Sequence, residues 1–246
     1  MKNTKKKVLV GALVVSLAAL VSVGSIAWFS ASDSVQNKFM VATSDDPDDP
    51  DKDFDVDVWE NTPTGKVNPE DPETPYVYPD VMPGDTLKKE TYVENTGNYE
   101  EYIRMIVTVS DADAWAALLS TEDTTVAPAD VKLTDIVTGL NETGFGLDED
   151  FTPVYDADAK TLTYVFYGNG VLPAGEKAKL FDAVKIPGSM TKEQADQFTV
   201  KGSDKQGSFT IDVKAQAVQT AHLGEGNTVF EKAKSAFTTV GMNITD

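Results

Sequence analysis

Short segments in which apolar and polar residues alternate, separated by turns rich in Gly and Pro, constrain this fold more than any other feature. The clearest segment is 101–110, where Ile103, Met105, Val107 and Val109 form one row and polar or smaller residues form most of the other. A period of two residues is typical of a β-strand with one buried face. The segment therefore predicts a half-buried strand.

The same pattern recurs along the chain. Further strands are predicted at residues 54–59, 86–94, 151–155, 161–167, 171–172, 179–187 and 208–220. Short helices are predicted at 111–120, where Ser110 or Asp111 can cap the first turn, and at 191–198 and 228–237. The proline-rich segment 61–79 predicts an irregular loop, and 122–150 has no clear period. Many short strands with few peripheral helices indicate an all-β antiparallel β-sandwich, and a jelly roll is the expected topology.

The N-terminus has the features of an export signal. Three consecutive lysines end at Lys7, and residues 8–29 contain no charge. Ser25 and Ala27 stand three and one residues before Trp28, which is the spacing that a signal peptidase recognises. Cleavage after Ala27 is expected, so residues 1–27 form the signal peptide. An uncleaved membrane anchor is the alternative, since the uncharged run reaches the roughly 20 residues that span a bilayer.

Residues 28–43 follow as a candidate donor strand. In an extended chain, Val35, Asn37, Phe39 and Val41 lie on one side, and Gln36 begins the row on the other. Residues 44–53 contain six Asp and two Pro, a composition that disfavours helices and central strands and predicts a solvated spacer. The β-sandwich domain is then expected over residues 54–246.

The acidic balance limits the classes of partner. The chain carries 21 Lys and Arg against 40 Asp and Glu. Loss of the leader with its four lysines leaves 21 − 4 = 17 basic residues and a formal charge of 17 − 40 = −23. Such a surface repels nucleic acid and anionic membranes, so no nucleic-acid partner is expected and membrane contact is expected only through an uncleaved leader.

The sequence offers little for catalysis. It has no Cys, His222 is its only histidine, and it lacks both the Gly-x-Ser-x-Gly and the His-Glu-x-x-His patterns. No enzyme activity, catalytic residue or cofactor is therefore predicted. Calcium stays open as a weak candidate, because the spacer supplies hard oxygen ligands without the order of an EF-hand loop. These candidate ligands are Asp45, Asp46, Asp48, Asp49 and Asp51.

Several motifs resemble the TasA/camelysin family of exported proteins with a SipW-dependent type of signal peptide. They are the junction Ile26-Ala27-Trp28-Phe29 with a Ser/Asp cluster and Asn37-Lys38-Phe39, the segment Val171-Leu172-Pro173-Ala174-Gly175-Glu176, and residues 180–187 and 215–219. The resemblance implies a jelly-roll domain that polymerises into biofilm-matrix fibres by strand donation. Ala174 interrupts the Pro-Gly pair of the family pattern, and the segments 44–53 and 61–79 are not associated with the fibre protein.

The expected function is a secreted structural subunit of a cell-surface or extracellular biofilm-matrix fibre. Its partners would be itself or a homologous fibre subunit, with a signal peptidase acting during export. The residues expected to mediate strand donation are Trp28, Phe29, Val35, Asn37, Phe39 and Val41. Pairing of this strand within its own domain, or a terminus without a partner, is the structural alternative. The functional alternatives are a membrane-anchored monomeric binding module or adhesin and, with less support, a camelysin-like metallopeptidase.

Overall fold

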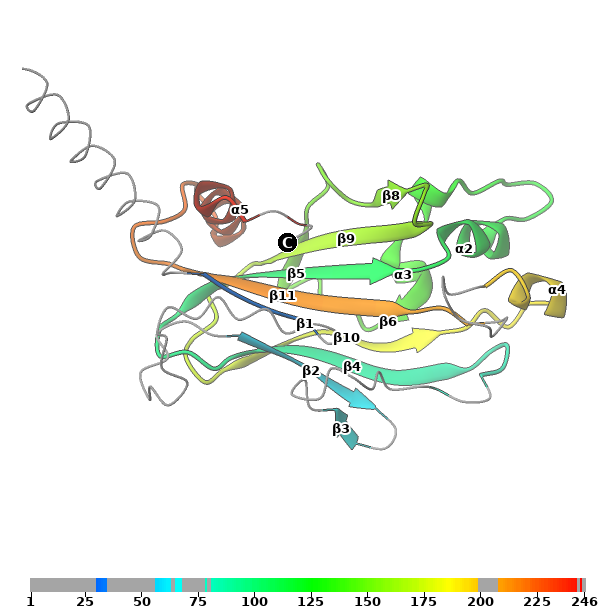
Figure 1. The fold of residues 1–246 in the computed structure, drawn as a ribbon, viewed down its shortest axis with the longest axis horizontal. Coiled ribbons are helices and arrows are strands. Elements are labelled where there is room, and N and C mark those ends of the chain that lie inside the picture. The colour runs from blue at the N-terminus through cyan, green and yellow to red at the C-terminus, as the bar shows by residue number, and fades with distance from the viewer. Residues whose placement is uncertain are drawn as a thin grey trace, which may run out of the picture.

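The chain folds into two antiparallel β-sheets with a few short helices (Figure 1). The computed structural model describes residues 30–34, 56–62, 65–67, 78, 81–198, 208–242 and 244, with the backbone alone described for 30–34 and 65–67. The prediction of an all-β chain with short helices is confirmed for this part of the chain.

Sheet A joins strands from both ends of the chain. Its order is β1-β11-β5-β9-β7, and β8 also pairs with β9. The strands are β1 (Ser30–Ser34), β5 (Glu101–Val109), β7 (Phe145–Leu147), β8 (Val154–Asp156), β9 (Thr161–Gly168) and β11 (Ile211–Gln219). The two longest neighbours, β11 and β5, pair over nine consecutive residues from Ile211 opposite Val109 to Gln219 opposite Glu101.

Sheet B has the order β3-β2-β4-β10-β6. The strands are β2 (Val56–Thr62), β3 (Gly65–Val67), β4 (Thr86–Asn95), β6 (Val137–Thr138) and β10 (Lys177–Lys185). The predicted loop at 61–79 is therefore wrong at its start, because Asn61 and Thr62 complete β2 and β3 folds back on it as a hairpin. The predicted strand at 171–172 is also wrong: Leu172 forms only an isolated bridge with Glu101.

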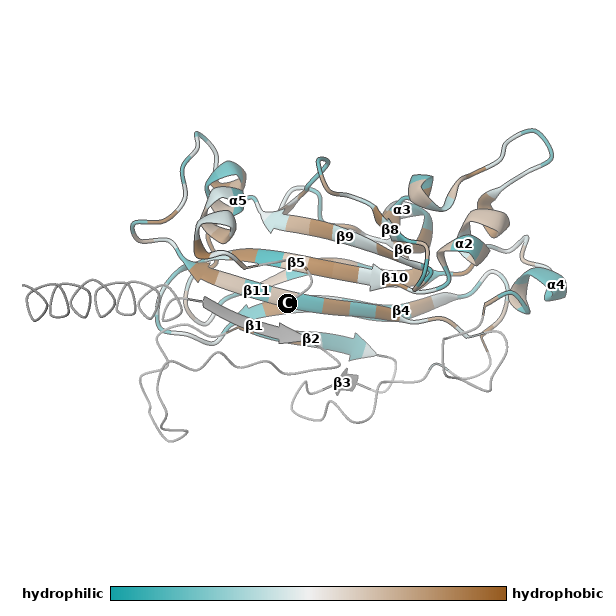
Figure 2. Ribbon diagram, turned by 45° about the horizontal axis from the view of Figure 1, so that its top comes forward, coloured by the Kyte–Doolittle hydropathy of each residue, from teal (hydrophilic) through white to brown (hydrophobic). Residues whose placement is uncertain are grey.

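One apolar core lies between the sheets. It contains Val56 and Val58 of β2 from sheet B together with the inward row of β5 from sheet A. That row is the one that the sequence predicts, Ile103, Met105, Val107 and Val109, and Figure 2 shows the corresponding apolar bands along the strands of sheet A. An ion pair between Lys89 and Glu60 is buried on the inner face of sheet B, with 10% and 3% of the two side chains exposed.

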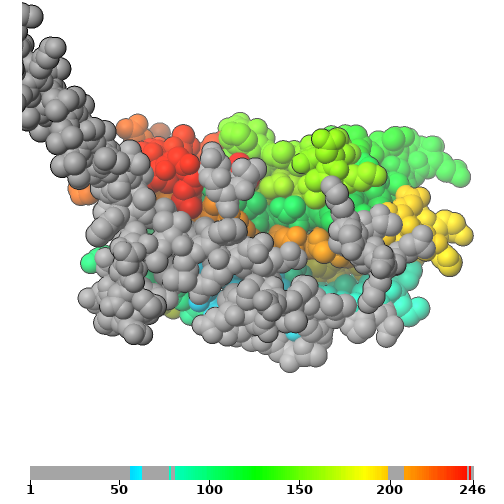
Figure 3. Space-filling view, viewed as in Figure 1, coloured from blue at the N-terminus to red at the C-terminus, as the bar shows by residue number. Residues whose placement is uncertain are grey.

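The helices lie at the periphery. They are α2 (Ala112–Leu119), η1 (Pro128–Asp130), α3 (Leu133–Ile136), α4 (Lys192–Ala195) and α5 (Val229–Val240). Figure 3 shows α5 in red and α4 in yellow at opposite ends of the molecule. η1, α3, β6 and β7 occupy the segment for which the sequence predicts no element, because their two to four residues are too short to show a period.

Two helix starts differ in how they are capped. Thr228 caps α5: its side chain accepts from the Glu231 N–H, and the Glu231 carboxylate accepts from the Thr228 N–H in return. Asp111 stands at the cap position of α2 with a φ of 57° and makes no side-chain cap. Its carboxylate accepts from the Ser110 hydroxyl at 2.6 Å instead. The predicted side-chain cap of α2 by Asp111 is therefore wrong.

Candidate assembly site

The N-terminal strand lies on the last strand of the chain. β1 pairs with β11 antiparallel, from Ser30 opposite Val218 to Ser34 opposite Lys214. β1 makes no ladder with its neighbour in sequence, β2, and stands at one edge of sheet A in the described part of the chain (Figure 1). β11 is thus the strand whose outer edge accepts residues 30–34 of the same chain, which is the pairing within its own domain that the sequence gives as the alternative to strand donation.

β11 presents two different faces. Val213, Ala215 and Ala217 belong to the core between the sheets, and all three are at most 1% exposed. Val218 belongs to a second apolar cluster on the opposite side of sheet A, and Gln216 is fully buried on that side. Odd-numbered positions of β11 therefore face the shared core, and even-numbered positions face the second cluster.

Arg104 of β5 contacts both β11 and α5. Its side chain donates to Oε1 of Gln216, including a 2.7 Å bond from Nε, and its Nη2 donates to the Met242 carbonyl at 3.1 Å. The guanidinium also stands 4.5 Å from the ring centre of Phe237 on α5. Because Arg104 can only donate, it orients the Gln216 amide with Oε1 towards itself. Within the described residues, the Gln216 Nε2 is then a buried donor without a hydrogen-bond partner.

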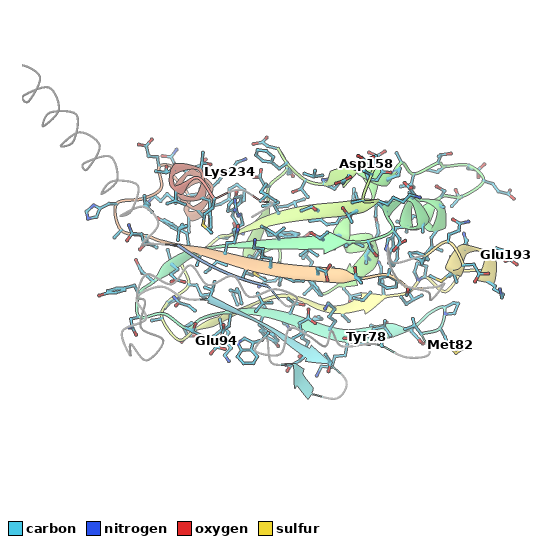
Figure 4. The ribbon with its side chains drawn as sticks, viewed as in Figure 1. Tyr78, Met82, Glu94, Asp158, Glu193 and Lys234 are labelled. Atoms are coloured by element: carbon cyan, nitrogen blue, oxygen red, sulfur yellow. The ribbon has the colours of Figure 1, made fainter. Side chains whose placement is uncertain are left out.

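α5 covers the second apolar cluster, and ion pairs hold one side of the helix. Lys234, labelled in Figure 4, donates to Oδ1 of Asp148 and to Oδ2 of Asp150, both at 2.7 Å. Partial burial lowers the pKa of Lys234, but the bonds to the two carboxylates outweigh it and leave that pKa raised. The hydrogen bond from Lys234 in turn lowers the pKa of Asp150. The carboxylates of Asp148 and Asp150 thus hold α5 in place.

All of the predicted assembly residues fall outside the described part of the chain. These are Trp28, Phe29, Val35, Asn37, Phe39 and Val41, together with the cleavage residues Ser25 and Ala27 and the calcium candidates Asp45, Asp46, Asp48, Asp49 and Asp51. Only the backbone of Ser30–Ser34, between Phe29 and Val35, is placed. Among the helices of the described residues, none is long and apolar enough to cross a membrane.

The single histidine and the acidic residues at the end of β8 lie at turns. His222 is an exposed residue with a φ of 61° in the turn after β11. Asp156 accepts the backbone N–H groups of Asp158 and Ala159 at 2.9 Å, which closes a turn. No group of three or more His, Cys, Asp and Glu side chains that could hold a metal ion occurs among the residues described.

The sequence places Arg104 on the polar side of its strand and gives no sign that this side is buried. The sequence of α5 could have revealed the role of Arg104. Phe230, Ala233 and Phe237 recur there at helical spacing, and such an apolar row needs an apolar surface to pack against. Only the sheet order shows that this surface is the outer face of β5, β9 and β11.

A scan of family models gave no match for this chain, and neither did searches of characterised proteins and of solved structures.

Proposed function

We propose that this chain is an exported, non-enzymatic structural subunit that assembles into a cell-surface or biofilm-matrix fibre by donating its N-terminal strand to the next subunit. The carrying observation is that β1 is an edge strand held by β11 alone among the ladders described. Residues 35–55 separate it from β2. Twenty-one residues (55 − 35 + 1) can span up to about 75 Å when extended.

The nested strand pairs support a jelly-roll sandwich as the finer description of the fold. β5 pairs with β9, β4 with β10, and β1 with β11, so each successive pair encloses the previous one along the sequence. A long hairpin rolled into two facing sheets produces this nesting. β1 belongs to the outermost pair, and it is therefore the strand that another copy can replace without unthreading the rest of the roll.

Exchange of this strand conserves its interactions. A strand from a neighbouring copy would make the same ladder with β11 as β1 does, because the sequences are identical. A contact in which one subunit gives a strand and the next receives it is head-to-tail, and such contacts propagate into filaments. The motifs shared with the TasA/camelysin family and the signal-like N-terminus favour the same assembly outside the cell.

The test is a mature chain that lacks residues 28–41. We expect it to remain monomeric on size-exclusion chromatography and to form no filaments on negatively stained grids, whereas the chain starting at Trp28 forms them. A synthetic peptide of residues 28–41 should raise the melting temperature of the truncated protein by refilling the edge of β11. A scrambled peptide of the same composition is the matched control.

Two results would overturn the proposal. Filaments that persist in the truncated protein would show that the segment is dispensable. A chain that keeps its leader, is recovered in the membrane fraction and stays monomeric at every concentration would instead favour the anchored binding module.

A further inference from the structure

We infer that the donated strand enters β11 in the register of β1, so that Val35, Asn37 and Phe39 of one copy point into the shared core of the next, with Phe39 opposite Phe209. This inference rests on the proposed strand donation. It goes beyond that proposal by specifying which side chains are recognised and where.

The register gives the alignment. Paired residues of β1 and β11 have numbers that sum to 248, as in Ser32 opposite Gln216 (32 + 216 = 248). The described part of β1 ends opposite Lys214, and β11 runs on for three further residues to Ile211. A donated strand that continues this register places residue 35 opposite Val213 and 37 opposite Ile211, and, where it extends past the start of β11, places 39 opposite Phe209, two residues before Ile211.

The two faces of β11 determine which side of the donated strand faces the core. Residues directly opposite one another in an antiparallel pair share a face of the sheet. Val213, Ile211 and Phe209 all pack in or against the core between the sheets. The apolar row of the donated strand therefore enters the core. A slip of one residue would turn Lys38 to the core side and take Val35 and Phe39 out of the core, so less apolar surface would be buried.

The outer row of the strand matches its side of β11 as well. The buried Nε2 of Gln216 has no acceptor among the described side chains, and Ser32 is the residue opposite it. Positions 30, 32 and 34 are all serine. A slip of two residues would again place a serine hydroxyl opposite Gln216. Gln216 therefore determines which side of the donated strand faces it, but it does not distinguish registers that differ by two residues.

An aromatic cluster is suited to select the register. Trp115 lies 5.1 Å from the ring centres of both Phe198 and Phe209. Trp115 and Phe198 are buried, but Phe209 is only partly buried and leaves part of its ring accessible. Phe39 is the single aromatic residue of the apolar row and reaches this position only when residue 39 stands opposite residue 209. The same register places Asp33 at a core-side position opposite Ala215.

Cysteine pairs test the register, because the chain contains no cysteine of its own. Gln36→Cys in one protein and Asp212→Cys in another would be mixed, assembled and treated with a short bifunctional thiol reagent. We expect intermolecular cross-linking to be at least about fivefold more efficient for this pair than for Ser34→Cys or Lys38→Cys with Asp212→Cys, since diagonal neighbours lie about 7–8 Å apart. All three positions are polar and lie on the same side of the strand.

The outcomes separate the two proposals. If Ser34→Cys or Lys38→Cys cross-links between chains to Asp212→Cys more efficiently than Gln36→Cys does, the register is overturned and strand donation is kept. Linkage only within a chain that carries both cysteines would overturn strand donation itself. Absence of linkage in every combination would overturn the placement of the segment on β11.

A second pair of variants tests the aromatic site. Phe39→Ala should raise the critical concentration for assembly at least about tenfold, because a buried aromatic side chain is lost. Met40→Ala, on the other side of the strand, should have a much smaller effect. Equal effects of the two variants would contradict the assigned phase, and circular dichroism of the monomers would verify that both domains are folded.

Discussion

The two faces of sheet A are covered in different ways. One face meets sheet B across a core that draws on most strands of the chain, whereas the other is covered mainly by α5 over a smaller cluster. Each contains a buried basic group, Lys89 paired with Glu60 in the first and Arg104 under Phe237 in the second. The main core therefore determines whether the domain folds, and the α5 cluster determines how firmly the outer face of β11 is supported.

The free energy of unfolding should fall most when the main core loses its buried lysine. Lys89→Met leaves the Glu60 carboxylate buried without its partner, and we expect a loss of about 3–5 kcal/mol in the free energy of unfolding. Glu60→Leu combined with Lys89→Met should recover most of it, because an apolar pair of similar volume removes the unpaired charge. Urea denaturation measures both. A single variant as stable as the double variant would show that the ion pair is not buried in solution.

A defect in the α5 cluster should destabilise the helix without unfolding the sheets. Phe237 is fully buried and contacts both Arg104 and Tyr167, with 5.8 Å between the Tyr167 and Phe237 ring centres. We expect Phe237→Ala to cost about 2–3 kcal/mol, less than a phenylalanine lost from a central core, because the helix can undock without unfolding the sheets. Amide hydrogen exchange should accelerate in α5 and remain slow in β5 and β10. Equal acceleration in all three elements would show that the two clusters unfold as one.

Acidification should loosen α5 by a smaller amount. The bond from Lys234 lowers the pKa of Asp150, and the N–H groups of Asn227 and Thr228 lower the pKa of Glu231. A carboxyl with a lowered pKa in the fold stabilises it above the unfolded value, near 3.9–4.3 for these residue types, and this contribution is lost as the pH falls through the folded value. Protection of α5 amides, corrected for intrinsic exchange, should therefore drop between pH 5 and about pH 3.

The matched control removes both titrations. The variant Asp150→Asn with Glu231→Gln should have weaker α5 protection at pH 6 and a flatter dependence on pH. If the unmodified chain keeps constant α5 protection across this range, the two carboxylates do not hold the helix.

Much of the local structure is readable from the sequence for a simple reason. The alternation in 101–110 predicts both the strand and its inward face, because the period of two is a property of the strand backbone itself. The cap of α5 is equally local, since Thr228 and Glu231 reach one another within a single turn. Very short elements such as α3 and β6 escape prediction because they contain too few residues to repeat a pattern.

The sequence by itself determined the longer strands, the inward row of β5 and the apolar, alternating character of residues 28–41. Only the tertiary structure decided that β11 stands between β1 and β5, that Arg104 and Gln216 are buried beneath α5, and that the odd positions of β11 face the shared core. Strand faces follow from backbone geometry within a few residues. Sheet order joins segments more than a hundred residues apart, and it is decided by which pairing buries the most apolar surface.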